Sequence, residues 1–354
     1  MSQTMRGLMD SAKKLDSVAQ RKISVVLGAA VADAAARPLH WVYDNAKLQS
    51  YIANVKETPE FLYESKSPFY SLPTGENSCY WDIAEASLKF AAENTTYSHK
   101  GLCDILARDF SPGNEKGYDM DARQVYMTKR SMGQKIDGPL DGKWFQGAVI
   151  EFLNNYKEGN GRVPFGGPKI KETDGFCLNL PLVCKFADEK NMDKISNEVI
   201  QTLSSYPTSV SHGMVASEII RKLIQDPTYN ILSIKDEIKS KYPDVSKSIA
   251  GIENVVSEKM DHVKAVIYVF GSPCYNPGSF QGAIHAVVTS NSYEEAVRKT
   301  IRAGGCNCSR SFFIGAMCGA KFGLEGIPMD WIEKTIHAES VLKLAMKAYG
   351  GNAD

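Results

Sequence analysis

Apolar residues recur along this chain every three or four positions, which is the spacing typical of amphipathic helices. One stripe of this kind consists of Ile83, Ala86, Phe90 and Ala91. Another consists of Val215, Ile219, Ile220, Leu223 and Ile224. Both stripes predict helices that turn one face toward a core, and the sequence contains no internal repeat, coiled coil or low-complexity tract.

Polar residues mark where some of these helices begin and end. Ser292 and Glu295 have the spacing of a capping box, and Gly304 follows at the position where that helix would stop. A final helix is predicted to begin after Asp330, with Glu333 in the matching capping position, and to continue nearly to the end of the chain. Its predicted inner face comprises Trp331, Thr335, Ala338, Leu342 and Ala345.

Helical spacing dominates the chain, and no segment is typical of a long flexible linker. The segment AVIYVFG at residues 265–271 has no deciding periodicity, so a short buried strand and a helix both stay open there. We predict an all-α fold in which residues 1–354 form one compact multi-helix domain. Residues 1–20 are expected to form either a less ordered segment or the first helix.

Charge and cysteine content narrow the class of protein. Lys plus Arg and Asp plus Glu both number 41, so no basic excess favours nucleic acid or an anionic membrane as a partner. A net charge near zero gives little repulsion between copies, which favours a homo-oligomer. The N-terminus is not typical of a secretory signal, and the apolar run at residues 25–36 is too short to cross a membrane. We therefore expect a cytoplasmic protein whose eight cysteines are reduced and mostly buried.

Four polar residues are candidates for chemistry. Asp33 lies among alanines and needs a partner, so it would cap a neighbouring element, pair with Arg37 or act as an acid/base. His40 would either transfer protons or pack beside the aromatic residues that follow it. Asp82 lies at the start of a predicted helix, where it would cap that helix or point at a cation. His212 precedes another apolar helix, where it would meet a ligand or simply pack.

The segment from Gly304 to Gly323 combines a glycine turn with an apolar helix. Cys306 and Cys308 alternate in the turn, but zinc needs four ligands and no CxxC redox motif is present. Inert, buried thiols are the simpler interpretation. In the helix, small residues recur every fourth position at Gly315, Gly319 and Gly323, which predicts a flat face that another backbone can approach.

Taken in order, these blocks resemble the ADP-ribosylglycohydrolase family from about Val25 to Gly323. The stretch Ala32–His40 resembles the family's GDAxGxPLE block, and Tyr80–Ile83 resembles its TDDT metal motif. Asp174–Gly175 with Pro181–Leu182 resembles a middle block, the stretch ending at His212 resembles a TH-type block, and Gly304–Ser309 stands where the family has GGDTDT. The resemblance implies an all-helical fold that holds two magnesium ions between the TDDT and GGDTDT turns and cleaves N- or O-linked ADP-ribose.

The chain departs from the family at the residues that would hold these ions. Cys306 and Cys308 occupy both acidic positions of the last motif, and thiolates are poor substitutes for the oxygen ligands that magnesium prefers. Among the matched positions, Asp82 and Ser309 keep oxygen ligands and are the vestigial metal candidates.

The other matched residues become vestigial candidates for catalysis and binding. Asp33 and His40 are the acid/base candidates, although His40 replaces an acidic residue of the family, and His212 is the ligand-binding candidate. With the anionic charge mostly lost, we expect neither a bound metal nor another cofactor.

Within the family, the sequence segments ADAAARPLHWVYD and GGCNCSRSFFIGA are most similar to those of the jellyfish J-type lens crystallins. This implies a soluble, structural protein of the eye lens on a hydrolase fold that is catalytically inactive. The alternative is an ADP-ribosyl hydrolase or ADP-ribose-binding protein with altered metal dependence. In that case Asp82 and Ser309 would hold one magnesium ion, Asp33 or His40 would act as acid/base, and His212 would touch the substrate.

Overall fold

The computed structural model describes residues 3–55, 58–114, 116–117, 120–134, 138–157 and 165–350. The elements of the first half are α1 (Gln3–Ala12), α2 (Ser17–Ala36), η1 (Arg37–Leu39), α3 (Asn45–Ile52), β1 (Tyr70–Ser71), α4 (Cys79–Glu93), α5 (His99–Phe110), α6 (Met120–Ser131), β2 (Leu140–Asp141), α7 (Gly147–Lys157) and α8 (Asp174–Lys185). Those of the second half are α9 (Met192–Leu203), α10 (Pro207–Gln225), η2 (Ile231–Ser233), α11 (Ile234–Glu237), α12 (Pro243–Ser257), α13 (His262–Ala265), η3 (Val266–Phe270), α14 (Gly278–Val288), α15 (Tyr293–Ala303), α16 (Asn307–Phe322), η4 (Leu324–Gly326), α17 (Met329–Lys334) and α18 (Ala338–Tyr349).

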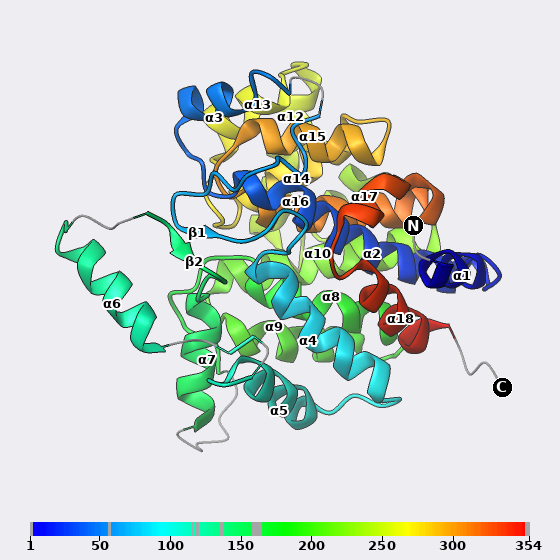
Figure 1. The fold of residues 1–354 in the computed structure, drawn as a ribbon. Coiled ribbons are helices and arrows are strands. Elements are labelled where there is room, and N and C mark those ends of the chain that lie inside the picture. Colours follow the sequence, from blue (N-terminus) through cyan, green and yellow to red (C-terminus); the bar gives the residue numbers. More distant parts are fainter. Residues whose placement is uncertain are drawn as a thin grey trace.

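The fold is all-α, as the periodicity predicts. The two strands that the described residues contain, β1 and β2, are two residues long and pair in parallel, with Tyr70 opposite Leu140. Helix α6 stands to one side of the helical body, while α2, α16, α10 and α8 lie within it (Figure 1). No helix in the described part of the chain is long and apolar enough to cross a membrane.

Helices α2 and α16 pack against each other more extensively than any other described pair of elements. Small residues allow this contact: a Cβ on Gly28 would collide with the carbonyl of Gly315, and one on Gly315 would collide with that of Gly28. A Cβ on Gly319 would likewise collide with the carbonyl of Ser24. The predicted flat glycine face is therefore confirmed at Gly315 and Gly319, where another backbone approaches closely. Gly323 does something else: it ends α16 in a left-handed conformation, with φ at 70°.

The two apolar stripes are confirmed as core-facing surfaces. All four residues of the first stripe are buried in α4, and all five of the second are buried in α10. Both helices pack on α8, so the stripes meet in one core.

The predicted boundaries of α15 are confirmed. The Ser292 hydroxyl accepts a hydrogen bond from the Glu295 backbone N–H at 3.1 Å, and Gly304 ends the helix with φ at 66°. The Glu295 carboxylate accepts from the backbone N–H of Asn291 at 2.8 Å, one residue before the cap. The segment at residues 265–271, for which strand and helix both stayed open, is helical from Ala265 to Phe270, where α13 continues into η3, and Gly271 ends it with φ at 92°.

The prediction of one final helix is wrong, because the chain forms α17 and α18 with a break between them. At the break, the backbone N–H of Ile336 donates to the carbonyl of Gly75 at 3.0 Å, and His337 contacts the Glu76 carboxylate at 3.1 Å. These bonds to a distant loop compete with the helical ladder. Helix α17 also begins after Pro328 rather than after Asp330, although all five predicted inner-face residues are buried.

Candidate functional site

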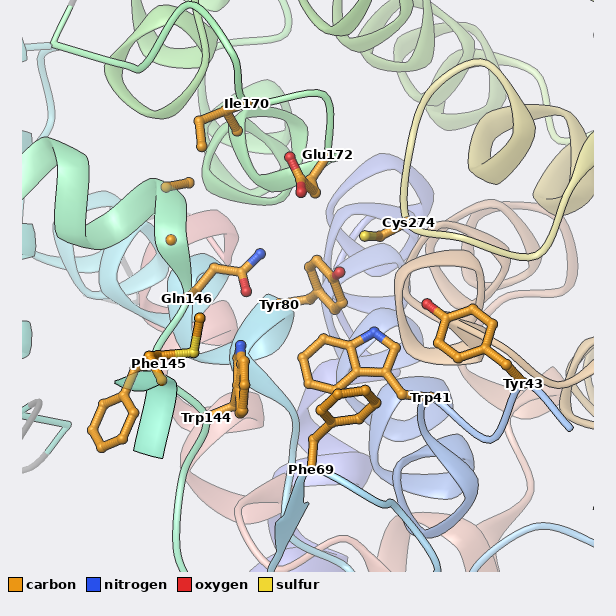
Figure 2. A pocket seen from close by; sticks show the side chains of 13 residues that line it. Trp41, Tyr43, Phe69, Tyr80, Trp144, Phe145, Gln146, Ile170, Glu172 and Cys274 are labelled. Carbon is orange, nitrogen blue, oxygen red and sulfur yellow. The ribbon is translucent and has the colours of Figure 1, made fainter. Parts of the chain in front are cut away.

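A pocket of about 310 Å³ opens beside the N-terminal end of α4. Most of its walls are aromatic and apolar, and it is lined by Trp41, Tyr43, Phe69, Tyr80, Met127, Trp144, Phe145, Gln146, Gly147, Ala148, Ile170, Glu172 and Cys274. Figure 2 shows Glu172 and Ile170 on one side of it, opposite Trp41, Phe69 and Trp144, with Tyr80 between them. Among its described lining residues, the pocket therefore combines an aromatic wall with a single carboxylate.

Three aromatic rings of this wall hold one another edge to face. The ring centroids of Trp41 and Trp144 lie 5.1 Å apart, those of Trp41 and Phe69 5.3 Å apart, and those of Phe69 and Trp144 5.9 Å apart. Such contacts favour the edge-to-face geometry that the ring quadrupoles prefer. The wall is thus preformed from three segments that are distant in sequence.

Behind this wall the Cys306 thiol lies in a cluster of hydrogen-bonding side chains. Its sulfur is 3.3 Å from Nε2 of His40 and 3.2 Å from the Tyr80 hydroxyl. The other nitrogen of His40, Nδ1, is 2.8 Å from the Tyr70 hydroxyl. His40 is fully buried and stacked on Trp41, so the sequence-predicted histidine connects the pocket wall to the thiol.

Backbone hydrogen bonds explain why the turn lies here. The N–H of Trp41 donates to the carbonyl of Gly305, and the N–H of Gly305 donates to the carbonyl of Val42, both at 2.8 Å. The N–H of Cys306 donates to the carbonyl of Ser272, also at 2.8 Å. Gly305 needs a left-handed backbone, with φ at 61°, and a Cβ there would collide with Ser272.

The two turn cysteines have opposite electrostatic environments. Burial opposes ionisation of Cys306, but a hydrogen bond from Cys274 and the nearby His40 hold the pKa of the Cys306 thiol well below its usual range. Donation to Cys306, together with burial, raises the pKa of Cys274 well above that of a free thiol. Burial also raises the pKa of Cys308. Of Cys274, Cys306 and Cys308, the cluster therefore favours ionisation of Cys306 alone.

The side chains of Cys306, Cys308 and Ser309, in the segment that matches the family's GGDTDT motif, do not converge on one point. The Cys308 sulfur points at the backbone carbonyl of Asp33, 3.9 Å away. The Ser309 hydroxyl is 3.0 Å from that of Ser279 and donates to the carbonyl of Cys306 at 2.9 Å. Cys306, Cys308 and Ser309 thus each have a different set of partners.

Asp82 is occupied by two lysines. Its Oδ1 atom accepts from the ammonium groups of Lys116 and Lys143, each at 2.7 Å, and Lys116 also pairs with Glu85. Burial would raise the pKa of Asp82, but the two ammonium groups lower it below its usual range. The capping role left open for Asp82 belongs instead to Ser78, whose hydroxyl accepts from the backbone N–H of Tyr80 at 3.3 Å.

Asp33 makes its hydrogen bonds at the start of α4. It accepts from the backbone N–H of Ser78 at 2.7 Å, from the Ser78 hydroxyl at 2.5 Å and from the Asn77 amide at 3.1 Å. Burial raises its pKa to about 6. Arg37 donates elsewhere, to the carbonyls of Pro73 and Glu76, at 2.6 and 3.1 Å.

His212 lies within α10 rather than before it, and it does not reach the aromatic pocket. Nδ1 is 2.7 Å from the carbonyl of Thr208, and Nε2 is 3.0 Å from the Ser248 hydroxyl. Burial lowers its pKa. It borders a much smaller cavity that it shares with Phe280 and Ser309.

Sequence reasoning did not single out Glu172, Gln146 or Cys274, which line the pocket. Gln146 donates to Asp174 at 2.6 Å, and burial together with Glu172 raises the pKa of Asp174 to about 8. The available signal was the pair of aromatic clusters, HWVY at residues 40–43 and KWFQ at residues 143–146, whose proximity the sequence alone does not reveal.

The matched motif residues contact other side chains and backbone groups of the protein. Among the described residues, no group of three or more His, Cys, Asp or Glu side chains is placed to hold a metal ion. Magnesium needs several oxygen ligands, whereas Asp82 is committed to lysines and Cys306 offers sulfur to hydrogen-bonding neighbours. The arrangement can form a thiolate and enclose a small ligand.

Comparison with known proteins gives a consistent picture. Residues 14–353 match the ADP-ribosylglycohydrolase family. Crystallin J1A and crystallin J1B of Tripedalia cystophora are each 29% identical to the chain, over 333 and 338 residues, which is 93% of this chain and 96% of either relative. A solved ADP-ribosylglycohydrolase-related protein complex contains a chain with a TM-score of 0.62 at 16% identity, covering 95% of this chain and 99% of its own, and it shares the fold.

Proposed function

Because the chain belongs to the ADP-ribosylglycohydrolase family, we propose that it is a crystallin-like structural protein that does not carry out magnesium-dependent hydrolysis of ADP-ribose. Two full-length relatives are crystallins, which supports the structural role. We extend the proposal to the eye lens and to a cytoplasmic, self-associating protein. The expected absence of a metal cofactor is part of the same proposal.

Our proposal that the protein is inactive as a hydrolase rests on the environment of Asp82. This carboxylate is the one acidic residue kept at the matched metal motifs, and it lies between Lys116 and Lys143. A divalent cation would have to displace both ammonium groups from a buried position, where like charges repel strongly. Internal ion pairing thus takes the place of metal ligation.

The test combines binding and turnover. Calorimetry of the purified protein with magnesium and with ADP-ribose is expected to give no heat of binding at millimolar ligand. A release assay on ADP-ribosylated arginine and serine peptides, with an active hydrolase of the family as positive control, is expected to give no product. Metal-dependent release would overturn the proposal and support the hydrolase alternative.

A variant of Asp82 shows whether any residual hydrolase activity depends on a metal at this position. Asp82→Asn removes the carboxylate that a metal would need while keeping its size. If the protein has hydrolase activity through a metal at this position, the variant loses it. Under our proposal the variant changes only the stability of the fold, which thermal unfolding measures.

The structural role has its own test. Quantitative mass spectrometry of lens tissue is expected to find the protein among the most abundant soluble chains, and sedimentation is expected to show a discrete oligomer. Low abundance in the lens would contradict the crystallin-like role without bearing on hydrolysis.

A further inference from the structure

We propose that the aromatic pocket is a binding site for a small organic ammonium cation, such as a trimethylalkylammonium group held between the Trp41 and Trp144 wall and the Glu172 carboxylate. The pocket volume of about 310 Å³ suits a small molecule. The proposal concerns a ligand of a different charge from ADP-ribose and does not depend on whether the protein is a crystallin.

Among the described residues, the lining of the pocket carries one acidic side chain and no basic one. Glu172 is its one carboxylate, and none of the lining residues in the described part of the chain is Lys, Arg or His. Oε2 of Glu172 is buried and has no hydrogen-bond partner among the described residues. The adjacent Lys171 is directed away, with its ammonium group 5.5 Å from the centroid of the Tyr206 ring.

The groups around Glu172 add to this field. Burial raises the pKa of the Glu172 carboxyl, hydrogen bonds from the backbone N–H groups of Glu172 and Lys171 oppose this, and negative charge at Cys306 and Glu151 adds to the rise. Arg310, the buried cation near the thiol, donates to the hydroxyl of Thr300 at 2.8 Å and to the carbonyl of Ser272 at 3.1 Å. A bound cation would therefore supply the positive charge that the protein does not place in the pocket.

The opposite wall suits a cation that carries methyl groups. Aromatic faces attract cations through their quadrupoles, and this attraction is stronger where water is excluded. The wall formed by Trp41, Phe69 and Trp144 is preorganised by its edge-to-face contacts, so little order is lost on binding. A bare metal ion would leave this apolar surface unused.

The same features argue against a diphosphate in this pocket. Its negative charge would lie beside Glu172, with no lysine or arginine lining the cavity among the described residues. Buried anions require a paired cation or several donors. The pocket thus selects against the charge of ADP-ribose and for that of an ammonium ion.

The experiment titrates choline into the full-length protein by calorimetry and tryptophan fluorescence. In parallel arms, 3,3-dimethylbutan-1-ol provides a neutral ligand of the same shape and ADP-ribose provides an anionic one. We expect choline to bind at least about tenfold more tightly than the neutral alcohol, because the Glu172 carboxylate and the aromatic faces attract the cation and not the neutral ligand. Equal affinity for choline and the alcohol, no binding of choline at tens of millimolar (roughly −2 kcal/mol), or tighter binding of ADP-ribose would overturn the proposal.

Variants locate the site. Glu172→Gln keeps the shape of the side chain and is expected to weaken choline binding about tenfold while leaving the neutral alcohol unaffected. Trp144→Leu is expected to weaken choline binding through the opposite wall. The matched control is Glu258→Gln, which removes an exposed carboxylate at the end of α12 and should leave both affinities unchanged. Circular dichroism of each variant verifies folding, and a folded Glu172→Gln protein that binds choline as the wild type does would contradict the assignment.

Discussion

The Tyr80 hydroxyl lies 3.2 Å from the Cys306 sulfur, which joins the two matched motifs that the family uses for metal. One residue comes from the first turn of α4 and the other immediately precedes α16. Neither side chain is a good ligand for magnesium, but the hydroxyl and the sulfur can form a hydrogen bond with each other. The two motifs thus still meet, through a hydrogen bond.

The ionisation of Cys306 can be measured directly. Because Cys274 and His40 hold its pKa well below the usual range, we expect the native protein to show thiolate absorption in the ultraviolet at neutral pH. Cys306→Ser should remove this absorption. Cys184→Ser is the control, since burial raises the pKa of that thiol to about 12. Identical spectra for the wild type and Cys306→Ser would contradict the assignment.

The buried ion pairs around Asp82 predict a large loss of stability when one partner is removed. Lys116→Met leaves the buried Glu85 carboxylate without its ammonium partner and is expected to cost about 3–5 kcal/mol in the free energy of unfolding. Lys100→Met provides the comparison, because the Lys100–Asp104 pair is exposed and worth less than about 1 kcal/mol. Chemical denaturation measures both, and equal effects would show that the Asp82 cluster contributes no more than a surface pair.

The contact between α2 and α16 predicts that an added methyl group is not tolerated. Gly315→Ala places a Cβ against the backbone of Gly28, so we expect a loss of about 1–3 kcal/mol or a failure to fold. Gly7→Ala, in the middle of α1 with open space around it, should leave stability unchanged or raise it by up to about 1 kcal/mol. Thermal unfolding of the two variants gives the contrast, and a neutral Gly315→Ala would mean that the helices can separate at no cost.

Asp174 predicts a defined pH dependence of stability. Its pKa is about 8 in the folded protein and near the ordinary value of 3.8 in the unfolded chain, so the folded state retains a proton that the unfolded state releases. The contribution of this group is therefore fully present below about pH 4 and falls by about 1.4 kcal/mol per pH unit as the pH rises toward 8.

The corresponding variant is Asp174→Asn, which cannot ionise. Its stability relative to the wild type should increase steadily between pH 5 and pH 8, as followed by urea unfolding at roughly unit intervals. Asp330→Asn, at an exposed ion pair with Lys334, should show no such trend. A constant difference between Asp174→Asn and the wild type across this range would mean that Asp174 is ionised throughout.

Much of the fold follows from the sequence because local spacing determines which faces are buried. The stripe in α4, the stripe in α10 and the ends of α15 depend on residues within one or two turns of each other. The break between α17 and α18 could not be predicted, because it depends on the bond from Ile336 to Gly75, more than half the chain away.

At the candidate site, too, the sequence predicts local features but not contacts between distant segments. The residue matches identified Asp33, His40 and Asp82 as candidate site residues, and all three are buried, but their partners lie on other segments. Lys116 and Lys143 reach Asp82 from the connections that follow α5 and precede α7, and no local pattern indicates this. The catalytic, metal-binding and ligand-binding roles of the matched residues stay predictions.

The backbone bridge between Trp41 and Gly305 makes the pocket wall and the thiol parts of one mechanical unit. Trp41 forms the wall, Gly305 is bonded covalently to Cys306, and two hydrogen bonds of 2.8 Å join the segments that carry them. A ligand that packs against the preorganised indole therefore also restrains the backbone that positions the sulfur. We expect the ultraviolet absorption of Cys306 to report whether the pocket is filled, without any added label.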